Sequence, residues 1–332
     1  MIKRCKILLF TALLALASSA HAHTLKIATL SPDGSDWMIK LREGAKQVEE
    51  QTGGRVKFKF YPGGVMGDNK AVLRKIKIGQ LHGGAITAGA LDKAYPDNEV
   101  LGLLFKYRDQ GEIDYVRRHL DPVLTQGFEK GGYVILGMAE AGFAYIMSSK
   151  APVASVADLR RQKVWIPAGD ETSAKSIAAF GITPVPLPLG DVLAGLQTDL
   201  VNAVAAPPIG VIALQWHTQI KYLTDMPLLY SLGVLAISNK AFKKIKPQDQ
   251  KIVREVMGKT FRAIDDKNKA DNRNALATLK DLGIQFVQPS EEQKKEWLKY
   301  AHAAQQRIIK EGVISQKMVD RVDALLKQYR SK

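Results

Sequence analysis

Short apolar runs alternate with stretches of helical periodicity along this chain. Residues 25–29 and 56–61 alternate as strands do, and the segment between them has apolar residues at helical spacing, at Trp37, Leu41, Ala45 and Val48. A helix over 69–78 and a strand near 84–87 continue the succession. Strands separated by amphipathic helices predict βαβ units and a mainly parallel sheet.

The pattern restarts after a strand at 133–138. Further strands are predicted at 145–148, 164–166, 183–186, 201–205 and 233–238, with helices at 172–180 and 191–197. One long charged helical pattern then fills 247–283, followed by a strand at 284–287 and helices at 290–311 and 315–328. A helix as long as 247–283 can brace two lobes, and the chain length also favours two domains.

The first 22 residues have the composition of a secretory signal peptide. Lys3, Arg4 and Lys6 precede an uncharged apolar run over 7–17, and small residues end the segment at Ala22. The apolar run is well short of the roughly 20 residues that a membrane helix needs, so we expect cleavage and export rather than an anchor. The single cysteine, Cys5, lies in this leader, so no disulfide is expected in the mature chain.

The charge balance is strongly basic. Lys and Arg number 48 against 33 Asp and Glu, and removing the three leader cations leaves 45 − 33 = +12. Such a balance raises nucleic acid as a partner. The lysines are scattered over helical stretches, however, without the interleaved aromatics that stack on bases. We expect a solvated basic surface and no nucleic-acid partner.

The sequence contains no recognisable catalytic or metal-binding pattern. The six histidines lack metal-ligand spacing, and no nucleophile elbow, Walker A or dinucleotide fingerprint has the right context. Asp170 and Glu171 are adjacent, so they cannot face each other on a helix as an acid/base pair, and Asp170 with Ser173 is typical of a helix cap. The sequence therefore predicts no enzyme, no metal site and no cofactor.

The segment 163–170 is the most informative part of the chain. It predicts a short strand stopped by Pro167, a turn at Gly169, and a helix capped by Asp170. Ligands of open α/β sheets bind beside the carboxyl ends of strands, so Trp165 is a candidate binding residue.

Several segments resemble, in order, the solute-binding subunit of tripartite ATP-independent periplasmic (TRAP) transporters, the DctP-type family. The likeness covers essentially the whole mature chain. It rests on residues 25–29, 53–59, 61–67, 157–159, 163–167, 196–198, 221–224 and 237–240.

The resemblance implies an α/β fold of two lobes, a periplasmic binding protein fold of type II-like class, with a long helix spanning both. We expect lobe I at 23–147 plus about 235–262, lobe II at 148–234 plus about 275–332, and the connecting helix at about 247–283. It also implies a small organic solute in the cleft between the lobes. The protein would work in the periplasm with the TRAP membrane subunits, without being embedded in the membrane itself.

The residues at the family's binding positions depart from its pattern. Similar proteins have an arginine that grips the solute carboxylate where this chain has Trp165. A second arginine corresponds to Ala144 and an asparagine to Ala206, whereas Thr87 keeps a polar group.

Two interpretations follow from these departures. In one, Trp165 is core packing and Lys93, Lys106 or Arg108 takes over the carboxylate. In the other, the cleft is apolar and aromatic, and its solute is neutral, weakly acidic or hydrophobic because an unpaired carboxylate would be costly there. A cationic solute over Trp165, helped by Asp33 or Asp170, is a variant of the second. The candidate lining residues are Trp165, Thr87, Ala144, Ala206, Leu189, Phe143, Tyr145, Asp33, Trp37, Asp170 and Trp216.

A receptor for another type of importer or for a sensory system would share the same two-lobed fold.

Overall fold

The computed structural model describes residues 22–331. The predicted signal peptide, apart from its last residue, lies outside these residues. Within residues 22–331, no helix combines the length and the apolar character needed to cross a membrane.

Lobe I is built around the first three strands. β1 (His23–Thr29) pairs in parallel with β2 (Val56–Tyr61) on one side and with β3 (Gly83–Thr87) on the other, as the βαβ pattern predicts. Two apolar cores lie against the lobe I strands, one of them under α2 (Asp36–Gln51) and the other under α3 (Asn69–Lys77).

The sheet as a whole is mixed, so the prediction of a mainly parallel sheet was wrong. β9 (Leu229–Ser238) runs antiparallel to β3 and to β4 (Tyr133–Ser148), in the order β10-β8-β4-β9-β3-β1-β2, with β7 also on β4. β4 is one strand where the sequence predicted two. Its register shifts at Ile135/Gly137 and Glu140/Gly142, and these bulges absorb the polar and glycine positions that break the apolar pattern.

Lobe II contains the shorter strands. β5 (Trp165–Pro167) pairs in parallel with β6 (Val185–Leu187), β7 (Ala203–Ala206) lies beside β4, and β8 (Tyr222–Thr224) connects β4 to β10 (Gln285–Val287). Its short helices are α5 (Val156–Arg160), α6 (Glu171–Ala178), α7 (Val192–Gln197) and α8 (Pro208–Ala213).

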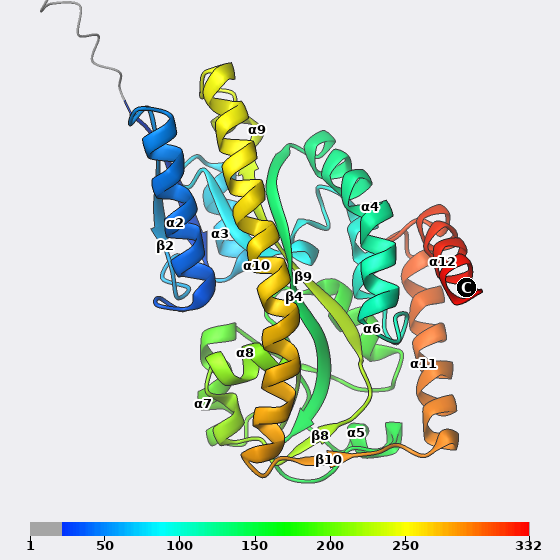
Figure 1. Cartoon of the computed structure of the whole chain (residues 1–332). Coiled ribbons are helices and arrows are strands. Elements are labelled where there is room, and N and C mark those ends of the chain that lie inside the picture. Colours follow the sequence, from blue (N-terminus) through cyan, green and yellow to red (C-terminus); the bar gives the residue numbers. More distant parts are fainter. Residues whose placement is uncertain (1–21, 332) are drawn as a thin grey trace, which may run out of the picture.

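α10 (Pro247–Asp281) is the predicted connecting helix. Its first half, from Val253 to Ile264, belongs to a lobe I core, and Leu276 and Leu279 belong to a lobe II core. Figure 1 shows it running the length of the molecule, with β4 and β9 crossing beside it. The two-lobed fold with a spanning helix is therefore confirmed.

Two helices differ from the sequence prediction. No element was predicted at α4 (Gln110–Lys130), a helix that has Pro122 inside it and buried positions at helical spacing. α11 (Glu291–Lys310) packs on α5 and α6 of lobe II, but α12 (Gln316–Arg330) packs on α4 and shares its core with lobe I. The predicted lobe II segment of 275–332 thus ends too late.

The remaining elements are short. They comprise α9 (Asn239–Phe242) and the 3-10 helices η1 (Ala88–Leu91), η2 (Pro96–Gly102), η3 (Leu189–Asp191) and η4 (Trp216–Thr218).

Candidate functional site

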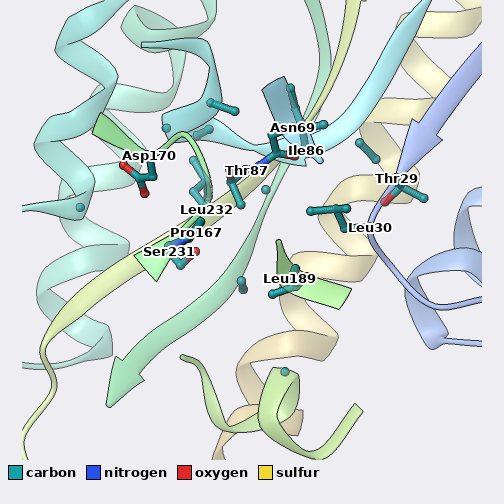
Figure 2. Close-up of a pocket in the computed structure, with 18 of the residues that line it drawn as sticks. Thr29, Leu30, Asn69, Ile86, Thr87, Pro167, Asp170, Leu189, Ser231 and Leu232 are labelled. Carbon is teal, nitrogen blue, oxygen red and sulfur yellow. Dashed lines mark hydrogen bonds between the residues drawn. The ribbon is translucent and has the colours of Figure 1, made fainter. Parts of the chain in front are cut away.

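A cleft lies between the lobes, beside the carboxyl ends of β1 and β3 (Figure 2). Lobe I contributes Thr29 and Thr87 at the two strand ends, together with Asn69 at the start of α3. Lobe II contributes the β5 turn and Leu189. The cavity measures about 1550 Å³, including an extension that reaches His82 and Lys240 near the other end of β3. This exceeds the roughly 300–1000 Å³ of a typical small-molecule site.

The two lobes touch at one edge of the cleft. Gly169, in the turn after β5, has φ of +81°, which a glycine adopts without strain. A Cβ built on Gly169 would lie 3.7 Å from Cβ of Lys70 in α3. The β5 turn of lobe II therefore lies beside the first turn of α3 in lobe I, close enough for a side chain at position 169 to contact Lys70.

Trp165 packs in the core of lobe II and also lines the cleft, the two alternatives predicted for it. It is only 6% exposed, and its ring meets that of Trp216 edge-on, with the centroids 5.2 Å apart. Its indole Nε1 donates to the carbonyl of Leu187 across the β5–β6 pair, at 3.0 Å. Since this is its only donor, Trp165 packs in the lobe II core and offers the cleft it lines an apolar surface.

The other expected anchor positions also line the cleft. Ala144 and Ala206 are buried methyl groups on β4 and β7. Thr87 is exposed and accepts a hydrogen bond from Nδ2 of Asn69 at 2.9 Å. Leu189, Trp37, Trp216 and Asp170 border the cleft as well.

Three predicted residues, all of them described, do not line the cleft. Because successive side chains of a strand point to opposite faces, Phe143 and Tyr145 face away where Ala144 faces the cleft. Phe143 packs edge-on against Tyr230, and burial raises the pKa of the Tyr145 hydroxyl to about 12. Asp33 pairs with Arg42 at 2.6 Å outside the cleft, and the hydrogen bond from that guanidinium lowers its pKa.

Of the three cations predicted as substitutes for the missing arginine, only one lines the cleft. Lys106 pairs with Asp323 at 2.5 Å, and neither it nor Arg108 lines the cleft. Lys93 does line it, from an exposed position after η1. Sequence reasoning missed six further exposed cations that line the cavity: Lys70, Arg74 and Lys77 of α3, Lys240 and Lys244 near the other end of β3, and Lys267 of α10.

Carboxylates lie deeper in the cleft than these cations. Asp92, Glu99 and Asp170 all line it from half-buried positions. Burial, and then the charges of Asp170 and Asp92, raise the pKa of Glu99 from 4.5 to about 8. Glu99 was missed because it lies in η2, within a stretch to which the sequence pattern assigned no element.

Asp170 caps α6, as predicted. Its carboxylate accepts from the backbone N–H of Ser173 at 2.8 Å and from the Ser173 hydroxyl at 2.7 Å. Among residues 22–331, no group of three or more histidine, cysteine or acidic side chains could hold a metal ion.

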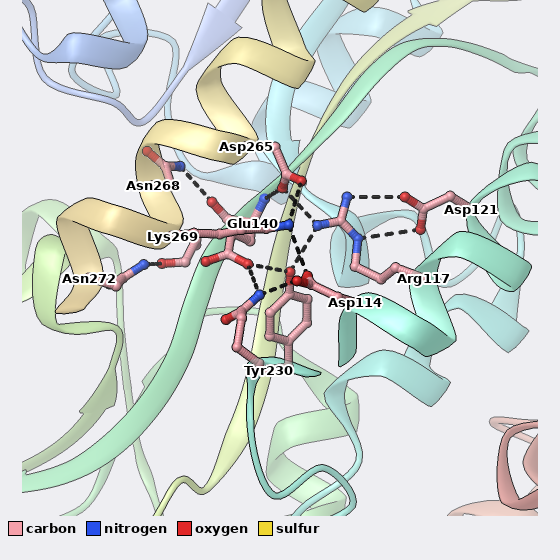
Figure 3. Close-up of polar contacts among 11 residues, drawn as sticks. Asp114, Arg117, Asp121, Glu140, Tyr230, Asp265, Asn268, Lys269 and Asn272 are labelled. Carbon is pink, nitrogen blue, oxygen red and sulfur yellow. Dashed lines mark hydrogen bonds and ion pairs between the residues drawn. The ribbon is translucent and has the colours of Figure 1, made fainter. Parts of the chain in front are cut away.

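A buried polar network joins the lobes behind the cleft, where β4, β9 and α10 cross (Figure 3). Arg117 of α4 donates to Asp265 of α10 at 2.7 Å and to the Tyr230 hydroxyl at 3.0 Å, and it pairs with Asp121. Tyr230 in turn donates to Glu140 on β4 at 2.9 Å.

The same network fixes the backbone of the second β4 bulge. Asp265 accepts from the N–H of Glu140, while Asn268 and Asn272 donate to the carbonyls of Glu140 and Ala141 at 2.6 and 2.8 Å. The bulge is therefore anchored to the connecting helix α10.

The chain matches a family of known proteins. The model of the DctP family, described as bacterial extracellular solute-binding protein, family 7, matches residues 27–311. Among curated relatives, the 2,3-diketo-L-gulonate-binding periplasmic protein of Escherichia coli is 25% identical over 81% of this chain and 82% of its own length. The sialic acid-binding periplasmic protein of Vibrio cholerae is 24% identical over 85% of this chain and 88% of its own.

Solved structures agree with the fold. A TRAP periplasmic solute-binding protein from Ralstonia eutropha with bound (S)-2-acetolactate superposes with a TM-score of 0.84, at 17% identity, over 92% of this chain and 99% of that one. One from Sulfitobacter with bound β-D-galacturonate gives 0.80, at 18% identity, over 93% and 100%. The family is one of solute-binding proteins for transport and not of enzymes. The chain belongs to the bacterial extracellular solute-binding proteins of family 7, the DctP family.

Proposed function

We propose that this protein is a TRAP-type receptor that traps an organic solute between its lobes and delivers it to membrane subunits of a secondary transporter. Family membership, the cleft at the strand ends and the periplasmic relatives support this role. The basic, apolar leader supports export to the periplasm and cleavage near Ala22.

The solute we propose carries an apolar or aromatic part, or is neutral, in contrast to a small dicarboxylate. The observation that carries this proposal is Trp165, which stands where an arginine is expected. Its one side-chain donor, Nε1, already donates to the carbonyl of Leu187 and is not free to bind a solute. Ala144 and Ala206 add methyl groups where similar proteins have polar anchors. Closure over a carboxylate without a buried cation would leave a desolvated charge unpaired.

The structural neighbours support the competing proposal, because those named above carry acids. A succinate-bound relative from Sulfurospirillum deleyianum shares 21% identity and a TM-score of 0.82, over 92% of this chain and 99% of that one. In this chain an acid would have to be met by an exposed cation such as Lys93, which would have to be drawn into the closed cleft.

Thermal-shift screening of a solute library tests the proposal, because a ligand that binds only the folded state raises the melting temperature. We expect the largest shifts from solutes with apolar or aromatic bodies. Stabilisation by C4-dicarboxylates or sialic acid alone would overturn the solute class.

Matched variants locate the binding. Leu189→Glu puts a charge into the cleft and should abolish the shift, whereas Leu200→Glu, at a residue 51% exposed and outside the cleft, should preserve it. Transport by reconstituted TRAP membrane subunits, driven by an ion gradient without ATP, would distinguish this role from a receptor of another importer or of a sensory system.

A further inference from the structure

Three carboxylates lie together in the cleft, and one of them has no partner: Asp92 accepts from the backbone N–H of Lys93 and Asp170 from Ser173, whereas Glu99 accepts from no described residue. The side chain of Glu99 forms no hydrogen bond or ion pair with any residue in 22–331, and it lies over Gly89, where a Cβ would be 3.0 Å from its Oε1. Asp92 follows η1 on the same lobe, and Asp170 faces them from lobe II. After burial, the charge of Asp170 helps to raise the pKa of both Glu99 and Asp92, and the charge of Asp92 also helps to raise the pKa of Glu99.

A second, independent group in the cleft also lacks a donor. Asn98 is only 3% exposed, and its Nδ2 donates to the carbonyl of Tyr95 at 2.7 Å, which fixes the orientation of the amide because a carbonyl can only accept. Its Oδ1 is left buried and without a partner among the described residues, and Asn98 lines the cleft. A buried acceptor without a donor costs free energy that a ligand can recover.

The charges are separated by depth. All seven lysines and arginines that line the cleft are exposed, and Lys267 among them pairs with Asp36 and Asp271, whereas Asp92, Glu99 and Asp170 are half-buried. Asp170 already accepts two hydrogen bonds from Ser173, so Glu99 has the larger unused capacity. Burial raises the pKa of both Glu99 and Asp92, which means that a nearby cation would stabilise their ionised forms.

We propose that the solute of this receptor carries a protonated amine, bound by Glu99 with Asp92 and Asp170, while its apolar part lies against the Trp165 side of the cleft. The inference rests on the receptor function proposed above and specifies its solute. An ammonium supplies the N–H donors that the Glu99 carboxyl lacks, and its single positive charge offsets part of the negative charge that the lobes bring together. Binding favours the carboxylate form of Glu99, and the displaced proton leaves to solvent.

Calorimetric titration of the full mature chain tests the amine directly. The probes are 2-phenylethylamine, 3-phenylpropionate and 2-phenylethanol, which share a ring and differ in charge. We expect the amine to bind at least about tenfold more tightly than either of the other two. Titration near pH 7 in buffers of different ionisation enthalpy should also show protons released on amine binding.

Variants assign the effect to Glu99. Glu99→Gln keeps the side-chain shape, and we expect it to weaken amine binding about tenfold or more and to abolish the proton release. Glu255→Gln, at an exposed residue of α10 outside the cleft, is the matched control and should change neither. A urea unfolding curve of each variant verifies that it is folded.

Three results would overturn the amine assignment. They are tighter binding of 3-phenylpropionate than of the amine, unchanged amine affinity in Glu99→Gln, and a library solute without an amine whose affinity is the same in Glu99→Gln and the parent. The last result would leave the receptor function intact. The receptor function fails on a different observation, which is that no solute of the library stabilises the protein.

Discussion

The indole Nε1 of Trp165 is hydrogen-bonded within lobe II, and its ring forms part of both the lobe II core and the cleft wall. Trp165→Ala should therefore destabilise the fold by about 3–5 kcal/mol, the usual cost of removing a large buried aromatic. Trp165→Phe keeps most of the packing and loses a hydrogen bond worth about 1 kcal/mol. Urea unfolding measures both free energies. A cost below about 1 kcal/mol for the alanine variant would show that Trp165 is not a core residue.

Glu99 should make stability depend on pH. Its pKa is raised from 4.5 to about 8, mainly by burial, so between these values the folded chain holds a proton that the unfolded chain has released. The free energy of unfolding contributed by this group must then fall as the pH rises through that window. We expect Glu99→Gln to flatten this slope and to be more stable than the parent near pH 8. Denaturation series at several pH values measure it, and a parent slope that survives in the variant would contradict it.

At the residue scale, the sequence indicated the anchors that are missing but not the groups that are present. Trp165, Ala144 and Ala206 could be compared with a family pattern because each lies on a strand of recognisable periodicity. Naming Phe143 and Tyr145 as well ignored strand alternation, which allows Ala144 alone of the three to face the cleft. Glu99 lies in a 3-10 helix, and its raised pKa depends partly on the charge of Asp170 in lobe II, which no local pattern encodes.

At the scale of elements, the second β4 bulge should be intolerant of side chains. Gly142 has φ of +109°, and a Cβ there would lie 2.3 Å from Nδ2 of Asn272, which holds the Ala141 carbonyl. Gly142→Ala should cost about 1–3 kcal/mol through strain and displacement of Asn272. Gly190→Ala is the control, because a Cβ at Gly190 meets nothing within 4 Å and should change stability by less than about 0.5 kcal/mol. Equal effects of the two substitutions in thermal unfolding would refute the account.

Arg117 should dominate the polar network at the crossing of β4, β9 and α10. It is buried among Asp121, Asp265 and Tyr230, so Arg117→Met leaves two carboxylates short of their partner. We expect a loss of about 3–5 kcal/mol, as for other broken buried pairs. Arg254→Met removes a half-exposed pair with Glu129 and should cost less than about 1 kcal/mol. Urea denaturation distinguishes them, and a loss in Arg117→Met no larger than that in the control would disprove the network's role.

Elements encoded by nearby residues were predicted well, and those that depend on distant partners were not. The β5 turn follows from Pro167, Gly169 and the Asp170 cap, all within four positions. The continuity of β4 depends instead on pairing with β9, roughly ninety residues later, and on the α10 side chains that bind its bulge. The local sequence predicts a break between two strands at that bulge, because the residues of the bulge are polar or glycine.

For the whole molecule, family resemblance and the length of α10 predicted two lobes with a shared helix, and the structure has them. The return of α12 to lobe I could not be read from its own sequence. Its apolar face could pack on either lobe. It packs on lobe I because α4 lies there, and α4 was not predicted from the sequence. An amphipathic face predicts that a helix is packed, without saying on what.

The closeness of Lys70 and Gly169 allows the arrangement of the lobes to be tested in solution. A Cβ on Gly169 would be 3.7 Å from that of Lys70, close to the mean separation of about 3.8 Å in disulfides. The double variant Lys70→Cys, Gly169→Cys should therefore oxidise to a disulfide that holds the lobes together. Its only competing thiol would be Cys5, which the mature chain is expected to lack.

Oxidation should trap solute or exclude it, because closing the edge of the cleft blocks exchange with the solvent. We expect solute dissociation in stopped-flow fluorescence to slow at least about tenfold in the oxidised variant and to recover on reduction. Each single-cysteine variant controls for the strain of a side chain at a positive φ, which oxidation alone cannot relieve. Failure of the disulfide to form under oxidising conditions would mean that the two lobes do not meet at this edge. Exchange that stays fast in the cross-linked protein would mean that the solute does not use the cleft between them.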